Sequence, residues 1–158
     1  MTLEKELGLK KEIAFLQHRA LLNIYYTASC LKKRAGEFFR PFKLTDVQFN
    51  LMMLLRYQSG EEEGLSQAQL SQMMLVNRAN ITSLVDRMEK AGFVIRTVSP
   101  ADRRSNIVKL TVKGQKLIAK IEPLYSAEVK KIMSCLKEQE QNKLVKILGD
   151  LRKSIGVR

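Results

Sequence analysis

The sequence predicts a mainly α-helical chain with one small β-hairpin. Apolar residues recur at helical spacing along most of the 158 residues. Two Ser/Thr-x-x-Gln capping boxes open short helices, and two segments rich in β-branched residues bracket a polar stretch. The chain is long enough for one well-packed domain, or for one compact lobe with an assembly lobe built onto it.

The first predicted element is a long helix from Leu9 to about Phe39. No proline interrupts it, and the apolar positions at helical spacing include Leu21, Ile24, Tyr25 and Ala28. Pro41 lies just beyond the predicted end. Because proline lacks an amide hydrogen and clashes with the preceding turn, it disfavours continuation of the helix.

Two capping boxes predict the next helices. Thr45 and Gln48 open a helix through about Tyr57, and the turn at residues 60–64, which carries Glu61, Glu62 and Glu63, follows it. Ser66 and Gln69 open a shorter helix that ends near Met74.

A further helix and a hairpin follow this short helix. Asn77 is a favourable N-cap for a helix that ends at Gly92. Residues 93–98 and 107–110 are predicted as paired strands, and the stretch between them forms a long basic tip.

The C-terminal part is predicted to be helical. Thr111 caps a helix that Pro123 is expected to kink. The later apolar stripes are Val129, Ile132, Met133 and Leu136, and then Leu144, Ile147, Leu148 and Leu151.

The net charge of +12 indicates a polyanionic partner. Residues 65–120 carry ten basic and three acidic side chains, and therefore hold +7 of this excess. The segment also carries the short helices and the hairpin, which favours nucleic acid. On charge alone, a basic helix at a membrane surface remains an alternative.

Several other classes of protein are disfavoured. The chain has no apolar run of spanning length and no signal-peptide pattern, so a cytoplasmic protein is expected without a membrane partner. Cys30 and Cys135 are far apart, and His18 is the only histidine, so no metal or other cofactor is expected. The three adjacent glutamates are interpreted as a solvated turn. No catalytic motif suggests an enzyme.

Helix, tight turn, helix and basic hairpin form, in this order, the winged helix-turn-helix arrangement, whose second helix enters the DNA major groove. In that second helix the predicted core stripe is Ile81, Leu84, Val85 and Met88. The outward positions are Ala79, Ser83, Asp86, Arg87 and Lys90, and Asn80 and Thr82 flank them. Arg78 lies in the first turn, where exposed amides attract phosphate.

The segment Leu65 to Gly114 resembles the MarR family. Its most specific parts are LVDRMEKAGFVIR from Leu84, DRR at residues 102–104 and LTVKG from Leu110. The resemblance extends over roughly residues 10–155. It implies a transcriptional regulator that binds double-stranded DNA, with residues 41–114 as the DNA-binding domain. Residues 1–40 and 115–158 would form a helical homodimerisation region.

The resemblance also implies roles for individual residues. The predicted DNA-binding set is Arg78, Asn80, Thr82, Ser83, Arg87, Asp102, Arg103 and Arg104. Within it, Asp102 would position Arg104 in the minor groove, and Arg103 would contact phosphate. The alternatives are a salt-bridged solvent turn at Asp102 and Arg104, and ordinary exposed helix positions at Thr82 and Ser83.

Members of this family commonly bind small aromatic or anionic effectors. The residues predicted to contribute to such a pocket are Tyr25, Tyr26, Phe42, Phe49, Arg56 and Tyr57, although aromatic residues at helical spacing are more often plain core. Cys30 lies one helical turn after Tyr26, and is either a redox sensor or a buried, inert thiol. We therefore expect a homodimeric regulator that binds a palindromic operator and acts as a repressor, relieved by a small-molecule or redox signal. The alternative is a winged-helix protein-interaction module that binds nucleic acid only loosely.

Overall fold

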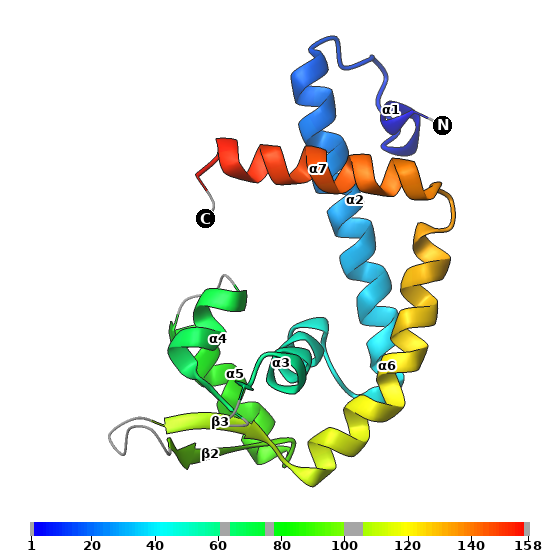
Figure 1. Cartoon of the computed structure of the whole chain (residues 1–158). Coiled ribbons are helices and arrows are strands. Elements are labelled where there is room, and N and C mark those ends of the chain that lie inside the picture. The colour runs from blue at the N-terminus through cyan, green and yellow to red at the C-terminus, as the bar shows by residue number, and fades with distance from the viewer. Residues whose placement is uncertain (1, 61–63, 75–77, 100–105, 157–158) are drawn as a thin grey trace. The chain divides into compact units, whose positions relative to one another are not determined.

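The computed structural model describes residues 2–60, 64–74, 78–99 and 106–156 (Figure 1). The chain divides into two compact units, Met1–Thr111 and Val112–Arg158. The helices of the first unit are α1 (Leu3–Glu6), α2 (Leu16–Phe39), η1 (Arg40–Phe42), α3 (Asp46–Tyr57), α4 (Gln67–Met74) and α5 (Arg78–Lys90). Its strands are β1 (Leu65–Ser66), β2 (Val94–Val98) and β3 (Asn106–Leu110). The second unit consists of α6 (Val112–Met133) and α7 (Glu138–Ser154). The predicted fold class is confirmed.

The start of the first long helix was predicted wrongly. The prediction began it at Leu9, whereas α2 begins at Leu16 and the short helix α1 precedes it. Gly8 has a φ of 66°, in the left-handed region that ends a helix easily. The backbone amide of Ile13 then donates to the carboxylate of Glu4 at 3.4 Å. This contact across nine residues supports a non-helical segment.

Both predicted capping boxes are present. The amide of Thr45 donates to the Gln48 side chain at 2.9 Å, and the amide of Gln48 donates to the Thr45 hydroxyl oxygen at 3.2 Å. Ser66 and Gln69 exchange the same two bonds at 2.8 and 3.2 Å. These bonds satisfy amides that the first helical turn leaves unpaired, so they fix where α3 and α4 begin.

The α5 helix ends in a Schellman motif at Gly92, whose φ is 75°. The amide of Gly92 donates to the carbonyl of Glu89, and the amide of Phe93 donates to the carbonyl of Met88. Thr111, which directly follows β3, lies beside Gly92 at the base of the hairpin. Its hydroxyl donates to the carbonyl of Gly92 at 2.6 Å, which closes the base of the hairpin.

The predicted hairpin is the larger part of a three-stranded antiparallel sheet with the order β1-β3-β2. In the hairpin Val94 pairs with Leu110 and Val98 pairs with Asn106. The two-residue strand β1, which was not predicted, pairs with β3 on its other side. Gly64 precedes β1, and a Cβ atom there would lie 2.9 Å from the carbonyl oxygen of Val108. A side chain at position 64 would therefore push the two strands apart.

The core of the first unit joins the helices to this sheet. Phe39 of α2 packs against Phe49 of α3, with ring centroids 4.8 Å apart, and both side chains are buried. The other buried apolar side chains of this unit include Leu51, Met52, Leu70, Ile81, Val85, Met88, Val94 and Val108. A buried core of this kind fixes α5 firmly in the unit.

Both helices of the second unit were predicted. The α6 helix continues through Pro123, and the expected kink there stays a prediction. Side chains from the predicted apolar stripe of α7 remain exposed, among them Leu144, Ile147 and Leu151. Apolar side chains of α2 are exposed as well, and these include Leu16, Leu21, Ile24 and Leu31.

Candidate nucleic-acid interface

The α5 helix has two sharply different faces. The predicted core stripe is buried in full, since Ile81, Leu84, Val85 and Met88 are each at most 4% exposed. The predicted outward positions are all exposed, and they are Ala79, Asn80, Thr82, Ser83, Asp86, Arg87 and Lys90. These side chains are small, polar or charged. Such a face suits the polar edges of bases and the phosphates of DNA.

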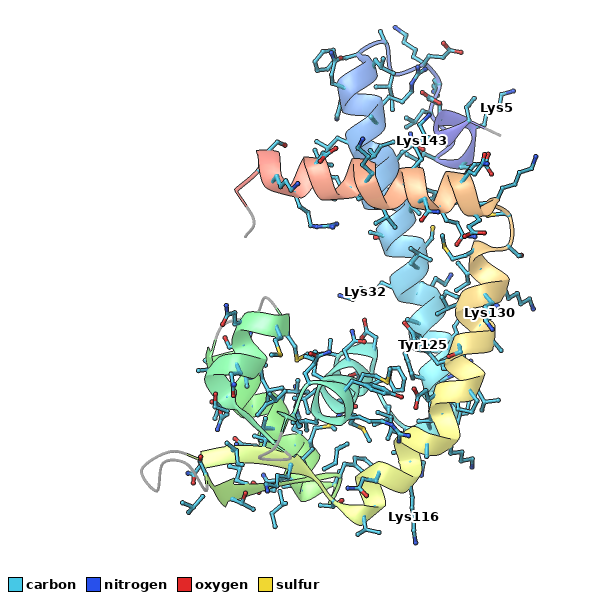
Figure 2. All side chains as sticks on the ribbon, viewed as in Figure 1. Lys5, Lys32, Lys116, Tyr125, Lys130 and Lys143 are labelled. Carbon is cyan, nitrogen blue, oxygen red and sulfur yellow. The ribbon has the colours of Figure 1, made fainter. Side chains whose placement is uncertain are left out.

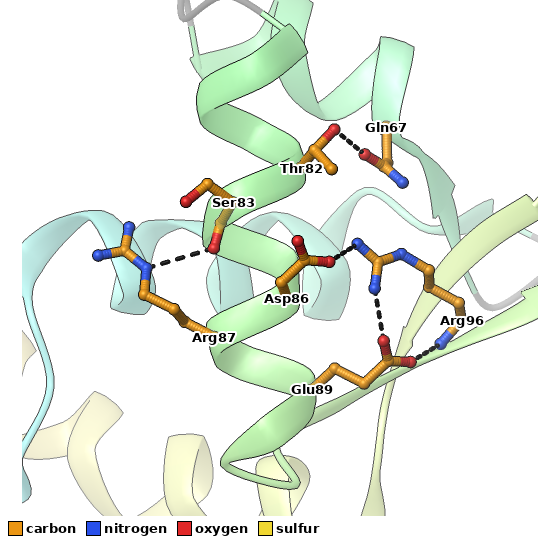
Figure 3. Close-up of polar contacts among 7 residues, drawn as sticks. All are labelled: Gln67, Thr82, Ser83, Asp86, Arg87, Glu89 and Arg96. Carbon is orange, nitrogen blue, oxygen red and sulfur yellow. Dashed lines mark hydrogen bonds and ion pairs between the residues drawn. The ribbon is translucent and has the colours of Figure 1, made fainter.

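Three of the predicted DNA-binding residues lie together on this face. Asn80 has the amide group that can pair with an adenine edge, and Ser83 lies nearly one turn later. The Nε hydrogen of Arg87 donates to the carbonyl oxygen of Ser83 at 3.2 Å (Figure 3). This bond directs the Arg87 side chain along the helix toward the position of Ser83.

Thr82 has a structural contact that the sequence did not reveal. Its hydroxyl donates to the side-chain oxygen of Gln67, the first residue of α4, at 2.8 Å (Figure 3). The hydroxyl therefore helps to join α4 to α5, the two helices of the helix-turn-helix.

The other predicted DNA-binding residues lie beside segments that are outside the described residues, or within them. Arg78 is the first residue of α5, at the end where exposed amides attract phosphate. Its predicted cap, Asn77, lies outside the described residues, as do Asp102, Arg103 and Arg104 at the tip of the hairpin. The roles of these residues stay predictions.

Arg96 of β2 makes three hydrogen bonds to α5, although no role was predicted for it from the sequence. Its Nη2 atom lies 2.5 Å from Oδ1 of Asp86, and its Nη1 atom lies 2.5 Å from Oε2 of Glu89 (Figure 3). Its backbone amide donates to the other oxygen of Glu89 at 2.8 Å. We call these three residues the Arg96 bridge. It joins the hairpin to the outer side of α5.

The charge of Arg96 is stabilised by this arrangement. Partial burial disfavours a charged guanidinium, but hydrogen bonds and charge attraction from Asp86 and Glu89 outweigh it and raise the pKa of Arg96 above its ordinary value. The only sequence signal was the spacing of the two carboxylates, three residues apart on one helical face. Nothing in that spacing names a partner in the following strand.

Basic side chains continue after the hairpin. Lys113, Lys116 and Lys120 are exposed on α6 and recur at helical spacing. Figure 2 shows Lys116 extending away from this helix. The second unit therefore adds positive surface close in sequence to the hairpin.

A cavity of about 500 Å³ lies between α3 and α4. Its lining is mainly apolar and consists of Val47, Asn50, Met53, Leu54, Tyr57, Gln58, Met73 and Met74. Of the six residues predicted for an effector pocket, Tyr57 alone lines this cavity. The Arg56 guanidinium lies 5.7 Å from the centre of the Tyr57 ring.

The structure distributes the other predicted pocket residues over different environments. Phe49 is part of the core beside Phe39, and Phe42 of η1 packs near Phe38 with ring centroids 5.8 Å apart. Tyr25 is 64% exposed on α2. These side chains do not converge on the cavity between α3 and α4.

Tyr26 and Cys30 of α2 interact as neighbours one turn apart. Charge interaction with Cys30, with a smaller contribution from partial desolvation, raises the pKa of the Tyr26 phenol above its ordinary value. Cys30 is exposed, which differs from the buried thiol considered as its alternative role. An exposed thiol is accessible to oxidants.

In the described parts of the chain, no three His, Cys, Asp or Glu side chains are grouped so that they can hold a metal ion. Among the described helices, none combines the length and hydropathy needed to cross a membrane.

Comparisons with known proteins match this chain to one family. The family model described as MarR family matches residues 44–106, which begin just after η1 and end at the first residue of β3. The HTH-type transcriptional regulator PecS of Dickeya dadantii is 30% identical over 117 residues, which cover 74% of this chain and 70% of PecS.

Solved structures share the fold. AbsC, a MarR family transcriptional regulator from Streptomyces coelicolor, has a TM-score of 0.83 at 19% identity and covers 94% of this chain and 100% of its own. The transcriptional repressor CouR, bound to a 23-mer DNA duplex, has a TM-score of 0.78 at 23% identity. The match covers 90% of this chain and 98% of the CouR chain. CouR from Rhodococcus jostii RHA1 bound to p-coumaroyl-CoA has a TM-score of 0.76 at 20% identity. The match covers 87% of this chain and 94% of that CouR chain. The chain belongs to the MarR family of transcriptional regulators.

Proposed function

We propose that this protein is a transcriptional repressor that binds a palindromic DNA operator as a homodimer. The observation that carries the proposal is the exposed face of α5, where Asn80, Ser83 and Arg87 lie above a fully buried apolar stripe. A helix of this kind fits the major groove with its polar side outward. The positive charge of residues 65–120 favours the same partner.

The alternative, a protein-docking module, is less well supported by the same face. Docking surfaces are enriched in large apolar or aromatic anchors. The exposed side chains of α5 between positions 79 and 90 include no large apolar one, since the apolar residues there are all buried except Ala79.

The homodimer is supported by apolar surface on the helices outside the helix-turn-helix. Ile147 of α7 is 53% exposed and Leu16 of α2 is 62% exposed, and both belong to apolar stripes. Exposed stripes of this length favour burial against another chain. We propose that residues 9–35 and 125–155 supply most of an interface on the order of 2,000 Å² or more.

We further propose that a signal relieves repression. CouR, which is a repressor, also binds p-coumaroyl-CoA. In this chain the cavity between α3 and α4 has room for a small aromatic molecule, and Tyr57 in its lining supplies an aromatic ring for stacking. Oxidation of exposed Cys30 beside Tyr26 is a second route. Either signal relieves repression only if it favours a dimer in which the spacing of the two α5 helices does not match the spacing of the operator half-sites.

The test is selection of genomic DNA fragments on the immobilised full-length protein, followed by footprinting of the enriched fragments. We expect protected palindromic sites near promoters, with half-sites about one helical turn apart. Enrichment of no fragment above bulk DNA would contradict sequence-specific binding and favour the docking module.

A further inference from the structure

The Arg96 bridge connects the two parts of the first unit that are proposed to meet DNA. Asp86 and Glu89 belong to α5, which presents Asn80 and Ser83 outward. Arg96 belongs to β2, whose last residue, Val98, pairs with Asn106 at the distal end of the hairpin. The orientation of β2 on α5 therefore determines where the Val98–Asn106 end of the hairpin lies relative to the exposed face of α5.

From this geometry we infer that Arg96 is a positioning residue for operator reading: it fixes the hairpin against α5 so that both match one DNA site. The inference rests on the proposed function. It assigns to Arg96 a role in specificity without contact to DNA.

The contacts of Arg96 favour this role over direct phosphate binding. Both terminal nitrogens of its guanidinium are within 2.5 Å of carboxylate oxygens, and its side chain is only 22% exposed. The third contact is made by its backbone amide. Three bonds to two residues of one helix fix both the position and the rotation of the strand.

A second effect of the bridge is on charge. Asp86 has a side chain that is 50% exposed on the outward face of α5, where DNA phosphates would approach. An uncompensated carboxylate there would repel the phosphates, and Arg96 offsets it. Positioning and charge compensation must therefore be separated by experiment.

The experiment compares wild-type protein with Arg96→Gln and with the triple variant Arg96→Gln, Asp86→Asn, Glu89→Gln. The triple variant also removes both carboxylates, so charge repulsion is absent while the bridge remains broken. Lys109→Gln is the matched control, because it removes one positive charge from the neighbouring strand. Affinity is measured for the selected operator and for random DNA of equal length over a range of salt concentrations. Thermal unfolding of every variant is recorded.

If Arg96 acts by positioning, Arg96→Gln lowers the ratio of operator to random affinity by about tenfold, roughly the loss of one base contact. The salt dependence of binding stays as in the wild type. The ratio of operator to random affinity stays low in the triple variant, whereas Lys109→Gln keeps the wild-type ratio. Recovery of the ratio in the triple variant would show that only charge compensation operates, and would overturn the inference. An unchanged ratio in Arg96→Gln would overturn it as well.

A direct DNA contact by Arg96 gives a different result. Operator and random affinities would then fall together, and the salt slope would decrease by about two per dimer. That outcome also overturns the inference. If Arg96→Gln does not fold, Arg96→Lys supplies the test, because lysine keeps the charge but cannot hold both carboxylates in the same planar geometry. The ratio of operator to random affinity is then expected to fall in Arg96→Lys. A wild-type ratio in this variant would overturn the positioning role. A ratio near one in wild-type protein would overturn the proposed function itself.

Discussion

The hydroxyl of Thr82 donates a hydrogen bond to the side-chain oxygen of Gln67 at 2.8 Å and so links the outer face of α5 to the first residue of α4. Thr82 was predicted as a groove-facing residue. The bond adds a structural role, because α4 and α5 form the helix-turn-helix and their relative position determines how α5 enters the groove.

Thr82→Val is expected to lower the free energy of unfolding by about 0.5 to 1.5 kcal/mol, the net contribution of a typical hydrogen bond, while the side-chain shape is kept. Denaturant unfolding measures this change. Gln67→Ala should show a similar loss, and the double variant should lose less than the sum of the two. Unchanged stability together with relaxed operator preference would show instead that Thr82 reads a base.

Asn80→Ala is expected to weaken operator binding by roughly 1 to 3 kcal/mol, because its amide is proposed to read a base edge. Preference should relax at one symmetric pair of operator positions, which a panel of single-base operator variants would detect. Equal weakening on operator and random DNA would contradict a base-reading role.

Arg103→Ala, at the hairpin tip, should weaken binding to operator and random DNA alike and reduce the salt slope by about two in a dimer, because phosphate contacts carry no sequence information. Arg104→Ala should instead lose most on operators with A·T-rich flanks, where the minor groove is narrow. Asp102→Ala should show a milder form of the Arg104→Ala loss. Wild-type affinity of Arg104→Ala at near-physiological salt would show that the tip is not in the groove.

The parts of the fold that were predicted correctly depend on local signals. The Thr45 and Ser66 capping boxes each act within one helical turn, and the core stripe of α5 follows from a period of 3.6 residues. Features that depend on distant partners were missed. Strand β1 exists because it pairs with β3 some forty positions later in the sequence. The break before Leu16 is accompanied by a contact from Glu4 to Ile13.

The same distinction applies to the site. The outward positions of α5 could be predicted because they are the complement of the apolar stripe. The Arg96 bridge could not, because ten residues and a turn separate Arg96 from Asp86. Five of the six predicted pocket residues are aromatic, a property that does not distinguish the core residue Phe49 from the cavity-lining residue Tyr57.

Ile147→Asp is expected to abolish the proposed homodimer, because it places an unpaired charge in an apolar interface. Ile147 is 53% exposed in the single chain, so folding of the chain should survive the change. Sedimentation at micromolar concentration, with circular dichroism for folding, measures both effects. Asn142→Asp, on the opposite face of α7, adds the same charge and should leave the dimer intact. A monomeric wild-type protein would contradict the proposed assembly.

Peroxide treatment is expected to lower operator affinity in wild-type protein if Cys30 is the signal-sensing thiol. Cys30→Ser should remove this sensitivity. Cys135→Ser is the matched control, since Cys135 is also exposed, and should keep it. Sensitivity that persists in Cys30→Ser would rule out this route and leave a small-molecule effector as the proposed signal.

The central claim is that this chain reads DNA sequence. The most direct measurement is the ratio of two dissociation constants, for the selected operator and for a scrambled duplex of equal length, determined by fluorescence anisotropy at near-physiological salt. We predict that the operator binds at least about 10³-fold more tightly, as is usual for specific DNA-binding proteins. Equal affinity for the two duplexes would contradict the claim.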